Sequence, residues 1–274
     1  MRKEKEESVG IHTFFVFLCI KRKNSIDMNF GYIWRNLPPV TKNLLIINLL
    51  VWLAINLLGH GTVNSAIIRY GALHYFTSSD FLPSQLFTYM FMHESFWHLF
   101  FNMFALFMFG GIIERTLGSA KFLFYYVSCG VGAALIQLGV YAVIINHYES
   151  IIGYDLLQMI EHEGADILRG MQNFRNPDAA YINQLVNIPT LGASGAVYGI
   201  LLAFGFLFPR QPIYLMFIPV PIQARWMVIG YGVIELLQAM NNNPADNVAH
   251  LAHLGGMIFG LLMLLYWKYN ERRA

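Results

Sequence analysis

The sequence predicts an all-α membrane protein with six transmembrane helices. Hydrophobic residues make up 56% of its 274 residues and charged residues only 12%, about half the charged fraction of a typical soluble domain. The mean hydropathy is +0.47. Apolar runs near the length that crosses a bilayer recur along the chain. They are Asn43–Leu58, Phe96–Ile113, Phe122–Ile145, Ser194–Phe208, Trp226–Met240 and Val248–Trp267.

The distribution of positive charge orients these spans. All but three of the 18 lysines and arginines fall on the side that would hold both termini; the exceptions are Arg69, Arg169 and Arg175. The positive-inside rule therefore predicts that both termini are cytoplasmic. The net charge of +2 gives no reason to expect a nucleic-acid partner. Cys19 and Cys129 lie on different apolar segments and do not indicate a disulfide framework.

The chain is expected to hold one membrane domain between two short cytoplasmic segments. The first segment is residues 1–41, in which the apolar run Val9–Ile20 is too short to span a membrane. Residues 1–27 therefore either precede a true start at Met28 or lie on the membrane surface. The other expected boundaries are a six-span domain at 42–268 and a tail at 269–274.

The outer loop between the third and fourth spans, residues 147–190, is long and acidic, with apolar positions at near-helical spacing. We expect it to form a lid of short helices, broken at Gly164 and at Asn176-Pro177. The loop is too short and too charged to bury a core of its own. It should therefore lean on the membrane or on the outer ends of the spans.

Four polar side chains share one depth in the expected bilayer. Counted at 1.5 Å per residue from the cytoplasmic charges that end their spans, Ser194 lies ~24 Å and His253 ~22 Å above that boundary. His98 and Asn102, on the second span, lie at ~25 Å and ~20 Å. The hydrocarbon core is ~30 Å thick, so all four lie several ångströms below its outer surface. Four polar groups at one level predict a site.

Stripes of small residues predict close packing of the fourth and sixth spans. The stripes are Gly195, Gly199 and Ala203 on one helix and Ala252, Gly256 and Gly260 on the other. Ser194 and His253 each lie beside a stripe, so packing brings the hydroxyl within reach of the imidazole, with Tyr198 stacked on the ring. This predicts a Ser–His dyad in which the imidazole takes the hydroxyl proton during attack. His98 and Asn102, on one helix face, would supply oxyanion donors.

Each of these residues has a simpler structural explanation when taken alone. Ser194, between Gly192 and Gly195, is of the type that most often caps a helix. His98 and Asn102 would more often be hydrogen-bonding groups between helices. The common depth of the four side chains favours the catalytic interpretation.

Metal ligation is not predicted. The segment HESFWH, residues 93–98, resembles a zinc-protease signature, but that motif needs histidines four apart. His250 and His253 are three apart and could share a metal, yet no further ligand is evident from the sequence. Glu235 in the fifth span is expected to be a hydrogen-bond partner between helices. We therefore expect no metal and no cofactor.

Three motifs together resemble the rhomboid family of intramembrane serine proteases. They are HLFFN at 98–102, GASG at 192–195 with Tyr198, and AHLGGMIFG at 252–260, in order on the second, fourth and sixth spans. The resemblance covers roughly 43–267 and implies a bacterial-type core of six spans. Many relatives have Trp-Arg where this chain has Ser84-Gln85, so the resemblance does not imply how the first outer loop is anchored.

The resemblance also implies roles for individual residues. Ser194 would be the nucleophile and His253 the general base, positioned by Tyr198, and His98, Asn102 and the Ser194 backbone N–H would form the oxyanion hole. Substrates would be single-span membrane proteins cut near a small residue, in or beside the membrane, without a cofactor or metal. We expect a bacterial inner membrane location. The alternative is a non-catalytic rhomboid-like protein that binds transmembrane segments.

Overall fold

The structure is a computed structural model that describes residues 30–57, 62–214, 220–240 and 250–271. The expected segment 1–27 and the first residues of the sixth apolar run lie outside the described residues. The described chain is mostly helical, and its two strands, β1 (Pro212–Ile213) and β2 (Ile222–Gln223), form one short antiparallel pair. The prediction of an all-α membrane protein is confirmed.

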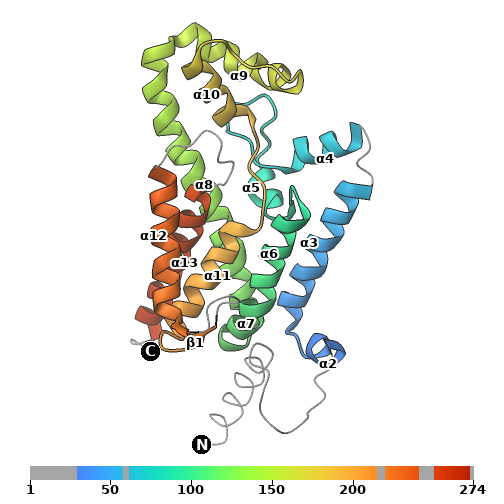
Figure 1. Ribbon diagram of the computed structural model, residues 1–274, viewed down its shortest axis with the longest axis vertical. Helices are drawn as coiled ribbons and strands as arrows, with labels where there is room; N and C mark the ends of the chain where they lie inside the picture. The colour runs from blue at the N-terminus through green and yellow to red at the C-terminus, as the bar shows by residue number, and fades with distance from the viewer. Residues whose placement is uncertain (1–29, 58–61, 215–219, 241–249, 272–274) are drawn as a thin grey trace, which may run out of the picture.

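Six long helical segments run side by side and form the bundle seen in Figure 1. They are α3 (Pro39–Leu57), the continuous run of α6 (Phe96–Ala105), η2 (Leu106–Gly110) and α7 (Gly111–Leu117), α8 (Ser119–Ile152), α11 (Ser194–Leu207), α12 (Ala224–Met240) and α13 (His250–Glu271). Shorter helices are α2 (Phe30–Arg35), α4 (Thr62–Gly71), α5 (Gln85–Thr88), η1 (Tyr89–Phe91), α9 (Tyr154–Arg169) and α10 (Pro177–Asn187).

Four of the six bundle segments meet the length and composition expected of a membrane span, and two are shorter. Among the described residues, α3, the run from α6 to α7, α8 and α13 are long and apolar enough to cross a membrane. Helix α11 is apolar but has only 14 residues, and α12 has 17. The count of six spans therefore stays a prediction, although each of the six expected runs coincides with one helical segment of the bundle.

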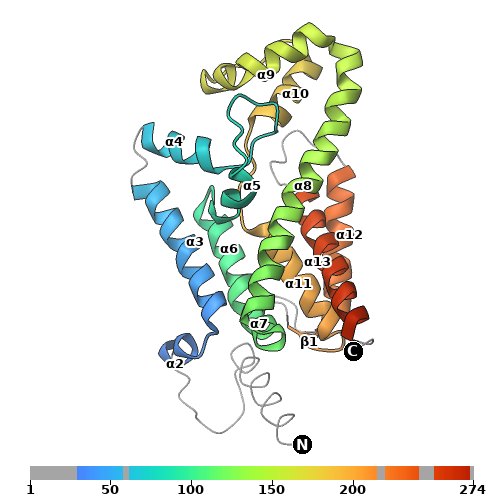
Figure 2. The same ribbon diagram turned by 180° about the vertical axis from the view of Figure 1, so that it is seen from behind.

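The basic ends of the helices lie together. Helix α2, the end of α7 and the end of α13 occupy one end of the bundle, whereas α4, α9 and α10 occupy the other, as Figures 1 and 2 show from opposite sides. Arg35, Arg115 and Lys268 thus share the first end, and Arg69 and Arg169 lie at the second. This arrangement matches the charge asymmetry from which the orientation was predicted.

Glycines bring the backbones of α11 and α13 into contact. A methyl group added at Gly256 would lie 1.8 Å from the carbonyl oxygen of Gly195, so only glycine fits there. The facing of the two small-residue stripes is therefore confirmed at this point. The stripes also serve α8: a methyl group at Gly199 would lie 2.5 Å from Cys129 Sγ, and one at Gly260 would lie 2.3 Å from the hydroxyl of Tyr125. Three helices are packed through these small residues.

The outer-loop insertion, residues 147–190, has longer helices than expected. Helix α8 continues through the start of the expected loop and ends before Gly153, which has a φ of 86°. The expected break at Asn176-Pro177 is confirmed, because Asn176 caps α10 and Pro177 is its first residue. The expected break at Gly164 is wrong. Gly164 lies inside α9, where a methyl group would meet the Asn183 side chain of α10 at 2.1 Å.

The apolar residues of the insertion face one another. Leu157 and Ile160 of α9 and Ile182 and Val186 of α10 are buried in the same hydrophobic cluster as residues at the end of α8. We expected these side chains to lean on the membrane or on the outer helix ends. They pack against one another and against the outer end of α8, so the expected contact with an outer helix end is confirmed.

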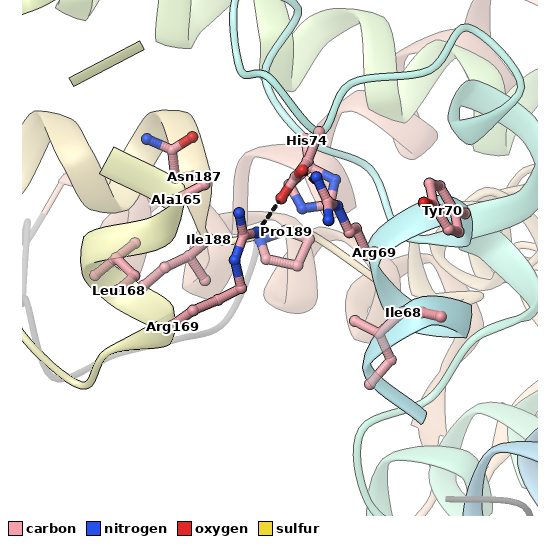
Figure 3. A pocket seen from close by; sticks show the side chains of 12 residues that line it. Ile68, Arg69, Tyr70, His74, Ala165, Leu168, Arg169, Asn187, Ile188 and Pro189 are labelled. Atoms are coloured by element: carbon pink, nitrogen blue, oxygen red, sulfur yellow. Dashed lines mark hydrogen bonds and ion pairs between the residues drawn. The ribbon is translucent and has the colours of Figure 1, made fainter. Parts of the chain in front are cut away.

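A buried carboxylate joins the insertion to the first outer loop. Arg69 from α4 and Arg169 from α9 converge in the pocket of Figure 3, each with a nitrogen 2.6 Å from an oxygen of Asp80. Gln85 anchors the same loop, because its Nε2 donates to the carbonyls of Arg69 and Asp80 and its Oε1 accepts from the backbone N–H of His74. Gln85 is completely buried and thus supplies the anchoring that the sequence left open.

The contact between α11 and α13 predicts a severe effect of one methyl group. Gly256→Ala should separate the helices and lower the free energy of unfolding by more than the roughly 1–3 kcal/mol typical of overpacking, since backbone atoms cannot rotate away. The midpoint of thermal unfolding in detergent measures this. Gly139→Ala on α8, where a methyl group meets nothing within 4 Å, is the matched control. Equal midpoints for the two variants would contradict the close contact.

Candidate active site

Ser194 and His253 are in hydrogen-bond contact. Ser194 is the first residue of α11, His253 lies in the first turn of α13, and Ser194 Oγ is 2.8 Å from His253 Nε2. Ala193, not Ser194, occupies the capping position of α11, so the simpler explanation of the serine as a helix cap does not hold. The hydroxyl is turned toward the imidazole, as the two stripes of small residues predicted.

The segment that leads into Ser194 is fixed by backbone hydrogen bonds. Thr190 and Leu73 exchange two N–H···O bonds of 2.8 Å, which pairs this segment with the chain that follows α4. The N–H of Gly192 then donates to the carbonyl of Tyr89 at 3.0 Å. Sequence analysis did not foresee these contacts, because they join residues more than 100 positions apart. They fix the start of α11 and therefore the position of the serine.

The histidine is held between an aromatic ring and a carboxylate. Tyr198 stacks on His253 with ring centroids 4.3 Å apart and an angle of 8° between the planes, as expected. The hydroxyl of Tyr198 donates to Glu235 Oε1, and Glu235 Oε2 lies 3.0 Å from His253 Nδ1 and 2.6 Å from His250 Nδ1. Glu235 does join helices, as expected, but it also lies against the imidazole, a role that sequence analysis missed.

The two expected oxyanion donors, His98 and Asn102, both lie on α6 but differ in how their side chains are engaged. A methyl group at Gly192, where φ is 132°, would lie 2.7 Å from His98 Nε2 and 3.7 Å from Ser194 Oγ, so His98 borders the serine. Asn102 is buried, and its Nδ2 donates to the carbonyl of His98 on its own helix at 3.1 Å. One amide proton of Asn102 is therefore already engaged. His98 Nε2 is not engaged in this helix contact and borders the space in front of Ser194.

Two pairs of histidines lie close to the serine–histidine contact. His93 lies in the loop before α6 rather than on the helix, and its ring is 5.0 Å from that of His98. The other pair gains a third member: Glu235, His250 and His253 each offer one ligand atom, and these atoms lie within 4.8 Å of one another. The third ligand that the sequence did not show is thus supplied by Glu235 of α12.

The fold and the serine–histidine contact define the class of this protein. It is a helical membrane protein whose bundle encloses a hydroxyl in hydrogen-bond contact with an imidazole. The model of the Rhomboid domain matches residues 82–270, more than half of the chain. The chain therefore belongs to the rhomboid family.

Curated relatives carry the same family name. The chain is 28% identical over 178 residues to Rhomboid protein 1, mitochondrial, of Saccharomyces cerevisiae, an alignment that covers 63% of this chain and 38% of that protein. It is 32% identical over 174 residues to RHOMBOID-like protein 12, mitochondrial, of Arabidopsis thaliana, with 62% and 42% covered. It is 24% identical over 220 residues to the human Presenilin-associated rhomboid-like protein, mitochondrial, with 73% and 44% covered.

These alignments span less than half the length of each of these three relatives. All three carry a mitochondrial label. They give no support to the expected bacterial inner membrane. What they and the family model establish is a rhomboid-family membrane protein.

Buried histidine beside the site predicts sensitivity to acid. Burial and, to a smaller extent, the neighbouring His98 together lower the pKa of His93, in the loop before α6, from 6.5 to about 3. Below pH 6.5 the unfolded chain binds a proton that the folded chain excludes, so stability falls as the pH falls, by about 1.4 kcal/mol per unit. We expect His93→Gln to flatten the decrease in unfolding midpoint between pH 7 and pH 5.

The matched control for this measurement is His162→Gln, at an exposed position on α9. It should keep the wild-type dependence on pH. If His93→Gln loses stability with acid as steeply as the wild type and His162→Gln do, the burial of a neutral His93 is not the cause.

Proposed function

We propose that this protein is an intramembrane serine protease that uses a Ser194–His253 dyad. The observation that carries the proposal is the 2.8 Å contact between Ser194 Oγ and His253 Nε2 inside a bundle of the rhomboid family. A nucleophile in hydrogen-bond reach of a base, with the base held by a third group, is the arrangement that activates a serine. No metal or cofactor takes part in this mechanism.

In the proposed reaction the hydroxyl oxygen of Ser194 attacks the carbonyl carbon of a substrate peptide bond. His253 Nε2 takes the hydroxyl proton as the new C–O bond forms, and then gives that proton to the leaving amine as the C–N bond breaks. Water, deprotonated by the same nitrogen, then hydrolyses the acyl-enzyme. Stacking on Tyr198 keeps the imidazole in the orientation that this requires.

Negative charge develops on the carbonyl oxygen during attack and needs donors. His98 borders Ser194, and the backbone N–H of Ser194 lies at the start of α11, where the helix dipole is positive. Asn102 would add its amide group if it turned from the carbonyl of His98. Gly192 leaves the space between His98 and Ser194 that a side chain would fill.

Glu235 extends the proposed dyad. Its Oε2, 3.0 Å from His253 Nδ1, lies on the opposite side of the ring from the serine. A carboxylate there favours the tautomer with a proton on Nδ1, which leaves Nε2 free to accept the hydroxyl proton. It also stabilises the positive charge that the imidazole gains during attack, as the aspartate of serine-protease triads does.

The proposed substrates are single-span membrane proteins cut near a small residue, in or beside the membrane. We propose that both termini face the cytoplasm or its equivalent compartment, because the basic residues gather at that end. The alternative function is a non-catalytic rhomboid-like protein that binds transmembrane segments. The contact between Ser194 and His253 favours catalysis, since binding alone does not need it.

The central prediction concerns the two residues of the dyad. Ser194→Ala and His253→Ala should each lower cleavage of a generic single-span substrate by at least about a thousandfold. Asn102→Ala should lower it by less, at most on the order of a hundredfold to a thousandfold, as expected for one oxyanion donor. The measurement is the appearance of cleaved substrate with purified protein in detergent.

Ser84→Ala, at an exposed serine, is the matched control and should cleave at the wild-type rate. Each variant should keep the wild-type unfolding midpoint, which separates loss of chemistry from loss of fold. EDTA should not lower the wild-type rate. Cleavage by Ser194→Ala, or inactivation by EDTA, would sink the assignment, and no cleavage by the wild type would favour the binding protein.

The carboxylate makes a separate prediction. Glu235→Gln should lower kcat by at least about tenfold with little change in KM, because the amide still fills the space but cannot stabilise the charged imidazole. Glu235→Asp, which keeps the charge, should recover part of kcat. Exposed Glu163→Gln is the control. Equal kcat values for Glu235→Gln and the wild type would show that the dyad works without this carboxylate.

A further inference from the structure

Three titratable side chains from two helices converge beside the proposed dyad. Glu235 comes from α12, and His250 and His253 lie one turn apart at the start of α13. Glu235 Oε2 is 2.6 Å from His250 Nδ1 and 3.0 Å from His253 Nδ1. The proposed mechanism uses Glu235 and His253 but leaves His250 without a role.

The three groups match the ligand chemistry of a borderline transition metal. Two imidazole nitrogens and one carboxylate oxygen are a common donor set for zinc, with one coordination position left open. A tetrahedral zinc ion with bonds of about 2.1 Å holds its ligand atoms roughly 3.4 Å apart. The ligand atoms here lie within 4.8 Å of one another, so movements of side chains alone would complete the site.

We propose that Glu235, His250 and His253 form an inhibitory binding site for zinc or a similar divalent transition metal. The inhibitory consequence rests on the proposed protease function, whereas the binding site itself does not. Mg²⁺ and Ca²⁺ prefer oxygen ligands and would bind poorly to a set with two imidazoles.

Inhibition follows from which nitrogen the metal occupies. Zinc bound at His253 Nδ1 displaces the proton from that nitrogen, and a neutral imidazole then carries its proton on Nε2. Nε2 is the atom 2.8 Å from Ser194 Oγ, and once protonated it can donate to the hydroxyl but cannot accept its proton. The metal also withdraws Glu235 from the role of balancing charge on the ring. Attack by Ser194 is thereby blocked without any ligand reaching the serine.

His250 is the member of the cluster that the proposed reaction does not use. Its side chain keeps 11% of its surface exposed, against 10% for His253 and 7% for Glu235, so all three ligands are largely buried. His250 can therefore be changed to test metal binding while the dyad stays in place.

Binding is tested without reference to activity. The full chain carrying Ser194→Ala, in detergent, is titrated with Co²⁺, whose visible absorption reports tetrahedral coordination. We expect saturation at one ion per chain, displacement by Zn²⁺, and no displacement by Mg²⁺. Adding His250→Gln should weaken binding by on the order of tenfold or more, whereas adding His162→Gln on exposed α9 should leave it unchanged.

Inhibition is tested on the active protein. Zinc should lower cleavage by the wild type, EDTA should restore it, and His250→Gln should need on the order of tenfold more zinc for half-inhibition, relative to its own zinc-free rate. Absence of Co²⁺ binding, or equal zinc sensitivity of His250→Gln and the wild type, overturns the proposal. Binding that depends on His250 in a protein without protease activity would keep the site and reject the proposed function instead.

Discussion

The backbone contact between α11 and α13 at Gly195 and Gly256 sets the geometry of the site. No side chain separates the two helices there, so their backbones are in direct contact. Ser194 and His253 project from positions next to this contact, and their 2.8 Å hydrogen bond is a result of it. Close approach between membrane helices gains van der Waals contact, and here the same contact fixes two reactive groups.

A second level of organisation is added by α12. Its Glu235 reaches Tyr198 on α11 and both His250 and His253 on α13, so one carboxylate joins three helices. A buried carboxylate within a membrane bundle is costly unless it is paired. The partners that lower this cost are the same groups that orient the imidazole, so the stability of the bundle and the geometry of the site depend on a common set of contacts.

Sequence reasoning reached those parts of the site that follow from position along a single helix. Depth counting placed Ser194, His253 and His98 at one level, and the spacing of glycines identified the facing sides of two helices. It did not assign Glu235 to the imidazole, because Tyr198 and Glu235 are 37 positions apart on different helices and no periodicity says which of their side chains meet. Such contacts depend on how α12 is rotated in the bundle.

The same limit applies outside the bundle. Gly164 was expected to break a helix, because glycine lowers helix propensity. In the structure it lies inside α9 and leaves room for the Asn183 side chain of α10. Gln85 shows no periodic signal of its importance, since its three hydrogen bonds reach residues 5, 11 and 16 positions earlier through the irregular path of the loop. Local sequence patterns predict the helices, whereas tertiary packing determines the structural role of single residues within them.

The length of α8 has a consequence for what meets the site first. Its 34 residues extend about 51 Å at 1.5 Å per residue, whereas the hydrocarbon core is only about 30 Å thick. An upright helix of this length that starts at the cytoplasmic boundary would extend roughly 20 Å beyond the hydrocarbon, and α9 follows directly from that outer end. A membrane protein diffusing toward the bundle would meet this raised structure with its extramembrane portion before its transmembrane segment reached the helices. The length of α8 would thus favour membrane proteins with small extramembrane domains over those with large ones.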